Sequence, residues 1–147
     1  MGREVRRVPK DWQHPTENGR LKPLHEGYAE TLAGFLAMQS KDGLQKALDY
    51  YGTAPDINDY MPEWTEAEKT HIQMYETCSE GTPISPVFEF PEQLAHWLAS
   101  THASAFGGMT ATYEQWLEVA RGGWAPSAVV ENGELKSGVA IAKGSVK

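Results

Sequence analysis

The sequence lacks most of the features that would place it outside ordinary globular proteins. Its 147 residues include one cysteine, Cys78, which excludes an internal disulfide and a zinc cluster of thiolates. No apolar run approaches the roughly 20 residues that a membrane helix requires. The basic start, MGREVRR, is followed by no apolar segment, so we expect no signal peptide. With 40% hydrophobic and 22% charged residues, the composition is that of one globular domain, and we expect a cytoplasmic protein.

Motifs for catalysis and for cofactors are also missing. The sequence has no HExxH motif, no GxSxG elbow and no Walker-type phosphate loop. Cys78 lies between Glu76 and Glu80, and acidic neighbours disfavour the thiolate that a nucleophile needs. No two histidines have the i, i+4 spacing of a zinc-binding helix; they are His14, His25, His71, His96 and His102. We expect no catalytic residue, no cofactor and no metal, although a carboxylate pair or a metal site assembled from distant residues stays open.

Positive charge is scarce in the middle of the chain. The net charge is −7, but residues 26–118 hold three Lys or Arg against fifteen Asp or Glu, a balance of −12. Residues 1–25 and 119–147 carry balances of +3 and +2. A surface built from the acidic middle repels nucleic acid and attracts a basic protein. The alternative is a solvated acidic surface that keeps the protein in solution.

Hydrophobic periodicity predicts the helices. Apolar residues recur at helical spacing in four segments, residues 27–40, 42–52, 92–101 and 113–121. Thr112 and Gln115 have the spacing of a capping box, and Pro91 suits a first helical position. The first two segments predict a helical hairpin, whose apolar stripes include Leu36 and Leu44.

Alternation and turn residues predict the strands. Residues 70–77 read as a strand with Ile72 and Met74 on one face and Gln73 and Tyr75 on the other. Residues 3–8 suggest a short edge strand, residues 9–23 an irregular loop, and residues 127–138 a hairpin around Asn132-Gly133. We therefore predict an α+β fold in which a small antiparallel sheet packs with about four helices. The predicted boundaries are a single compact domain at 1–137 and a flexible C-terminal tail at 138–147.

The candidate binding residues lie in loops rich in aromatic, hydroxyl and proline residues. Trp12 and Trp124 stand beside prolines, and Ser79 to Pro86 form a polar loop before a second extended segment. Aromatic residues dominate binding hot spots, whereas the alternative is that they pack on prolines and that the hydroxyls bond their own backbone. The candidates are Trp12, His14, Tyr75, Glu76, Ser79, Glu80, Thr82, Ser85, Trp124 and Ser127. We expect the Trp12 loop to dock against the strand that ends at Tyr75 and against the Trp124 turn.

Three motifs stand in order along the chain. They are RVPKDWQHP at residues 7–15, YETCSEGTPISP at 75–86, and WAPS at 124–127. In these motifs the sequence resembles a family of small proteins encoded by tailed bacteriophages and prophages. The resemblance implies a phage accessory protein in the cytoplasm of the host bacterium, and it implies no mechanism.

Two functions follow as hypotheses. The first is a non-enzymatic binding protein that engages a basic host protein, such as a defence or nucleic-acid-handling complex, through its acidic surface, without binding nucleic acid or membrane. The second is a protein that binds or sequesters a small molecule or nucleotide, or a minor enzyme, using the aromatic and hydroxyl-rich loops. A structural component of the virion is a third class.

Overall fold

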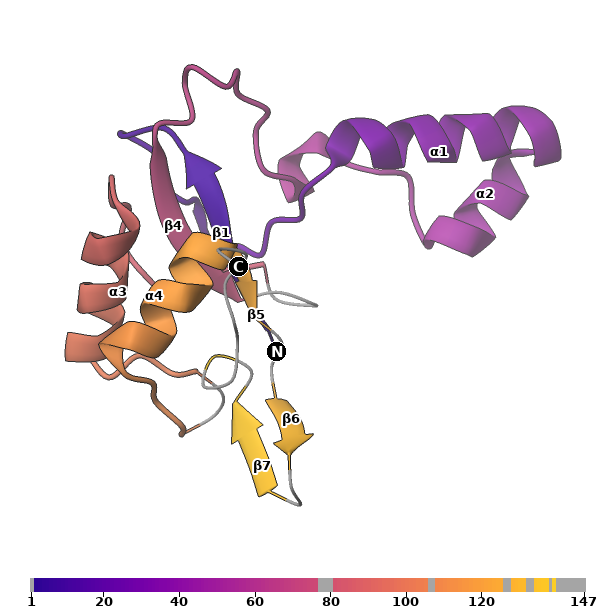
Figure 1. Ribbon diagram of the computed structural model, residues 1–147. Coiled ribbons are helices and arrows are strands. Elements are labelled where there is room, and N and C mark those ends of the chain that lie inside the picture. The colour runs from indigo at the N-terminus through magenta and orange to yellow at the C-terminus, as the bar shows by residue number, and fades with distance from the viewer. Residues whose placement is uncertain are drawn as a thin grey trace. The chain divides into compact units, whose positions relative to one another are not determined.

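The computed structural model describes residues 2–76, 81–105, 108–125, 128–131, 134–137 and 139. Four helices and small antiparallel sheets occur in this part of the chain, so the predicted α+β class is confirmed (Figure 1). Contacts divide the chain into two compact units. Met1–Lys22 and Trp64–Lys147 form the sheet unit, and Pro23–Glu63 forms the hairpin unit.

The centre of the sheet unit is a three-stranded antiparallel sheet. Its middle strand is β1 (Arg3–Val8), which pairs with β4 (His71–Glu76) on one side and β5 (Trp124–Ala125) on the other. In the register of β1 and β4, Arg3 stands opposite Glu76 and Val8 opposite His71. The prediction of an edge strand at residues 3–8 is therefore wrong, because both edges of β1 are paired.

Two buried arginines explain why the sequence of β1 is not typical of a central strand. Arg3 donates hydrogen bonds to the carbonyl oxygen of Ser104 at 3.0 Å and lies 3.7 Å from a carboxylate oxygen of Glu76. Arg6 places its guanidinium 4.4 Å from the centre of the Tyr75 ring. Burial lowers the pKa of Arg3, and the negative charge of Glu76 opposes this shift. A buried charge is tolerated where it is paired and hydrogen-bonded, and these arginines are.

Helices α3 (Pro91–Ser100) and α4 (Tyr113–Gly122) pack on each other and against β4 and β1 (Figure 1). Pro91 occupies the first turn of α3, and the capping box of Thr112 and Gln115 opens α4, as predicted. The core that they enclose includes the fully buried residues Met74, Leu94, Leu98, Trp116, Val119 and Val139. Val139 thus lies in the core beyond the boundary predicted at residue 137, and residues 138 and 140–147 of the predicted tail lie outside the described residues.

Two short hairpins complete the sheet unit. β2 (Thr16–Glu17) pairs with β3 (Arg20–Leu21) across Asn18 and Gly19, whose φ angles are 54° and 78°. Positive φ at both turn positions is what a type I′ hairpin turn requires, so the loop predicted for 9–23 contains a regular element. β6 (Ala128–Glu131) pairs with β7 (Glu134–Ser137), which confirms the predicted hairpin; its turn, 132–133, lies outside the described residues.

The hairpin unit consists of α1 (Tyr28–Asp42), α2 (Leu44–Tyr51) and the 3-10 turn η1 (Ile57–Asp59). A single residue, Gly43, separates the two helices, and its φ of 95° is available to glycine without strain. Phe35 and Ala47 are buried between the helices. Leu36 and Leu44, by contrast, are each 51% exposed, so the apolar stripes of the sequence are only partly covered.

No helix in the described part of the chain combines the length and the apolar character that crossing a bilayer needs.

Candidate functional site

A hydrogen-bonded cluster of aromatic residues covers the second face of the sheet. Tyr75 is fully buried, and its hydroxyl accepts a hydrogen bond from Trp12 Nε1–H at 3.1 Å. The same hydroxyl lies 3.0 Å from His14 Nδ1 and 3.0 Å from Gln73 Oε1. Gln73 and Tyr75 alternate with Met74 along β4, so they point away from the helical core. Four side chains from two distant segments therefore meet at one phenolic oxygen.

The segment that carries Trp12 and His14 is docked by further contacts. The Trp12 ring packs edge-on against Trp64, with 5.0 Å between ring centres. His14 Nε2 lies 2.5 Å from the carbonyl oxygen of Lys22, and Lys22 N–H donates to the carbonyl of Pro15 at 2.9 Å. The predicted docking of the Trp12 loop on the strand that ends at Tyr75 is confirmed. The other predicted anchor, the Trp124 side chain, lies outside the described part.

Ser85 serves the structure of the loop. Its hydroxyl accepts a hydrogen bond from Met74 N–H at 2.9 Å and donates to the carbonyl of Pro86 at 2.9 Å. Its carbonyl oxygen accepts from Gln73 Nε2 at 2.7 Å. Of the two interpretations of this hydroxyl, the structure supports the one in which it bonds backbone groups. The result is that Ser85 pins the 83–87 segment onto β4.

The other candidates fall into three groups. Glu76 and Thr82 lie together, since the Glu76 carboxylate accepts from Thr82 Oγ1 at 3.5 Å and also faces Arg3. Neither residue lines the hollow that adjoins the cluster around Tyr75. Trp124 contributes its backbone to β5 opposite Glu4. The remaining candidates lie outside the described residues; they are Ser79, Glu80 and Ser127.

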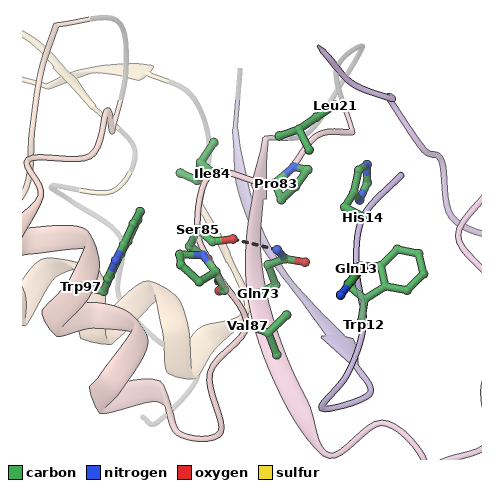
Figure 2. A pocket seen from close by; sticks show the side chains of 11 residues that line it. Trp12, Gln13, His14, Leu21, Gln73, Pro83, Ile84, Ser85, Val87 and Trp97 are labelled. Carbon is green, nitrogen blue, oxygen red and sulfur yellow. Dashed lines mark hydrogen bonds between the residues drawn. The ribbon is translucent and has the colours of Figure 1, made fainter. Parts of the chain in front are cut away.

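An open hollow of about 540 Å³ adjoins the cluster. Figure 2 shows Gln73 at its centre, with Ile84 and Trp97 on one side and Trp12 and His14 on the other. We call it the Trp12 hollow; its lining residues are Trp12, Gln13, His14, Leu21, Gln73, Pro83, Ile84, Ser85, Pro86, Val87 and Trp97. Sequence reasoning missed Gln73, although its position two residues before Tyr75 on the same strand face was a usable signal. It also missed Trp97, which lies in the predicted helix at 92–101 and packs against the core as well as lining the hollow.

The protonation of His14 follows from its surroundings. Burial lowers the pKa of His14 below 6.5; the carbonyl of Lys22 opposes this shift, and the positive charge of Arg6 adds to it. The ring is therefore neutral at pH 7. Because a carbonyl oxygen only accepts hydrogen bonds, the proton of the neutral ring resides on Nε2, which faces Lys22. Nδ1 is then an acceptor and faces Tyr75.

The hairpin unit has a hollow of its own, of about 560 Å³. We call it the hairpin hollow; its lining residues are Met38, Asp42, Gln45, Lys46, Asp49 and Tyr50. Gln45 Nε2 donates to a carboxylate oxygen of Asp49 at 2.9 Å, one helical turn away on α2. Two carboxylates, a thioether and a phenol ring thus share one concave surface. Such a surface offers charge and apolar contact together.

Among the described residues, no group of three or more His, Cys, Asp or Glu side chains has an arrangement that could hold a metal ion. Comparison of the chain with protein-family models, with curated proteins and with solved structures finds no match.

Proposed function

We propose that this protein acts by binding a basic protein through its acidic surface, and that the hairpin hollow receives a Lys or Arg side chain of that partner. The observation that carries the proposal is the composition of this hollow, in which the carboxylates of Asp42 and Asp49 outnumber the one ammonium group, that of Lys46, and are accompanied by Tyr50 and Met38. Carboxylates pair with a guanidinium or ammonium group, and a phenol ring attracts the same cations.

Charge over the whole hairpin unit supports the proposal. Pro23–Glu63 contains seven Asp or Glu and two Lys, a balance of −5 out of the chain's −7. All nine of these charged side chains are exposed. A concentration of one sign on a small surface raises the rate at which a partner of opposite sign associates.

Exposed apolar side chains in the same unit supply the second component of an interface. Tyr50 is 72% exposed and Ile57 is 62% exposed, in addition to the half-exposed Leu36 and Leu44. Large apolar residues gathered at a surface are characteristic of protein-binding sites, whereas charge alone explains solubility equally well. Steering by charge and burial of these residues would act in succession as the partner docks.

The resemblance to proteins of tailed phages suggests where the partner is found. In that setting the partner is a protein of the host bacterium, such as a component of a defence or nucleic-acid-handling complex. A basic groove that holds nucleic acid has the charge that the hairpin unit complements.

The test is capture from a bacterial lysate at two salt concentrations. The tagged protein is incubated at about 0.01 M and about 1 M salt, where charges are screened beyond about 30 Å and about 3 Å. We expect a protein with a basic surface to be retained at low salt and released at high salt. Retention of no basic protein at either salt concentration would refute the proposal.

Variants in which carboxylates are replaced by amides then show which part of the hairpin unit contacts the retained partner. Asp42→Asn with Asp49→Asn removes two charges from the hairpin hollow, whereas Glu30→Gln with Glu63→Gln removes two from elsewhere in the same unit. Because the net charge is identical, both pairs slow association alike. Only the first pair should also speed dissociation, and it should weaken affinity about threefold to tenfold more than the control. Equal affinities of the two double variants would exclude the hairpin hollow as the contact.

A further inference from the structure

The cluster at Tyr75 has one proton fewer than its hydrogen bonds require. The Tyr75 hydroxyl carries a single proton, and two possible acceptors lie at 3.0 Å from it, His14 Nδ1 and Gln73 Oε1. Trp12 Nε1–H donates to the oxygen and cannot supply the missing proton to either acceptor. One of the two acceptors therefore lacks a donor within the cluster whenever His14 is neutral.

Neither acceptor can turn away to escape this shortage. The Gln73 amide is held by its Nε2–H, which donates to the carbonyl of Ser85 at 2.7 Å; flipping the amide would set two carbonyl oxygens against each other. The His14 ring is held by Nε2–H, which donates to the carbonyl of Lys22. Gln73 and His14 both line the Trp12 hollow. The single lone pair of His14 Nδ1 points at the Tyr75 hydroxyl, whereas Gln73 Oε1 has a second lone pair, so Oε1 is the atom to which a ligand in the hollow can donate.

We propose that the Trp12 hollow binds a flat, neutral aromatic molecule that donates one hydrogen bond to Gln73 Oε1, so that the Tyr75 proton can go to His14 Nδ1. This proposal is independent of the proposed function, because it concerns the other unit of the chain. The volume of about 540 Å³ lies within the range of ligand sites, and apolar side chains line most of the hollow. An aromatic plane matches the rings of Trp12 and Trp97 and the prolines of the 83–87 segment.

Neutrality of the ligand follows from the charges near His14. The Arg6 guanidinium on β1 lies over the Tyr75 ring, its charge acts on His14, and it disfavours a cationic ligand. The ammonium group of Lys22 lies 3.9 Å from the Glu17 carboxylate, so its charge is already paired and does not call for an anionic ligand. An anion, in turn, gains nothing from the leftover acceptor, because both carry negative charge density. A neutral N–H or O–H group supplies the missing proton without introducing a charge.

The test compares indole with 1-methylindole, which have the same apolar ring system but differ in the N–H donor. Binding is followed by NMR titration of the isotope-labelled full chain, and the site is located by intermolecular NOEs. We expect indole to saturate, with NOEs to Ile84 and Val87, and to bind about 3- to 10-fold more tightly than 1-methylindole, as one hydrogen bond predicts. Equal affinities, NOEs to other residues or absence of a saturable shift would each overturn the proposal.

Two further experiments test whether the preference for indole depends on the number of protons shared at the Tyr75 hydroxyl. In His14→Leu the Tyr75 proton goes to Gln73 alone, so the preference for indole should disappear; in Gln13→Ala, a control in the same lining, it should persist. On the unaltered protein, the preference should also disappear at a pH where imidazole ¹⁵N shifts show His14 to be protonated. The cationic ring then donates from Nδ1 to Tyr75, which donates to Gln73, and the shortage is gone. A preference that survives both changes would contradict the assigned acceptor.

Discussion

The close approach of the two helices in the hairpin unit makes Gly34 the position where a single methyl group should matter most. A Cβ atom added at Gly34 would overlap the hydroxyl oxygen of Tyr51, with the next nearest atom, Tyr51 Cζ, at an ordinary 3.6 Å. The Tyr51 ring is packed against the rings of Phe35 and Tyr50, which oppose its moving aside, so forcing such an overlap costs about 1–3 kcal/mol. Alanine in the interior of a helix stabilises it by about 0.8–1.0 kcal/mol relative to glycine. Gly34→Ala should therefore destabilise the hairpin unit by about 1 kcal/mol on balance.

Removing the one overlapping atom reverses the expected sign. In a Tyr51→Phe background the added Cβ meets only ordinary contacts, so Gly34→Ala should stabilise α1 by up to about 1 kcal/mol. The two backgrounds thus differ by about 1–3 kcal/mol, a coupling that a double-mutant cycle resolves. Amide hydrogen exchange in α1 and α2 is the appropriate measurement, because it reports the local opening of this unit separately from that of the sheet unit.

Two results would refute this reasoning. If Gly34→Ala stabilises the helices with Tyr51 present, the close contact does not exist. If the effect is equal in both backgrounds, the hydroxyl oxygen of Tyr51 is not its cause.

Three further predictions concern the sheet unit. Trp12→Ala removes the packing on Trp64 and a hydrogen bond, and should lower the free energy of unfolding by roughly 2–4 kcal/mol; an unchanged thermal midpoint would mean that the loop is not docked. Hydrogen bonds from Lys69 and Arg7 lower the pKa of Glu66 to about 2, so an NMR titration of its carboxyl should show protonation only near that pH, and its stabilising contribution, present above 4.5, should be lost as pH falls toward 2. Because the pKa of His14 is lowered, its contribution to stability is complete above pH 6.5 and is lost as pH falls through the folded value; urea unfolding at several pH values should show a steeper loss on acidification for the unaltered protein than for His14→Gln.

The local elements of this protein could be predicted because each depends on a few neighbouring residues. The capping box at Thr112, the proline at the start of α3 and the alternation of residues 70–77 all have local physical causes, and the structure contains the elements that they predict. The alternation of polar and apolar positions in this strand also placed Met74 on the side of the core.

The role of β1 was not predictable in the same way. Arg3 and Arg6 make residues 3–8 look like an exposed strand, and their burial depends on partners from distant segments, Glu76, Ser104 and Tyr75. The sequence shows that an arginine is charged, but it does not show which carboxylate or aromatic ring will lie beside it and compensate the charge.

The residues of the candidate site, too, were predictable from the sequence only in part. Its aromatic residues stand out in the sequence, since Trp12 and His14 lie in a segment too irregular to hold itself. Gln73 and Trp97 became part of the site only because the Trp12 segment folds back over β4 and the 83–87 segment lies beside it. The sequence alone thus determined the helices, the β6–β7 hairpin and the acidic character of the hairpin unit, because these depend on neighbouring residues and on composition. Which charges are buried, and which acceptor at Tyr75 lacks a proton, was decided only by the tertiary structure, because hydrogen bonding and desolvation depend on distances between residues far apart in the chain.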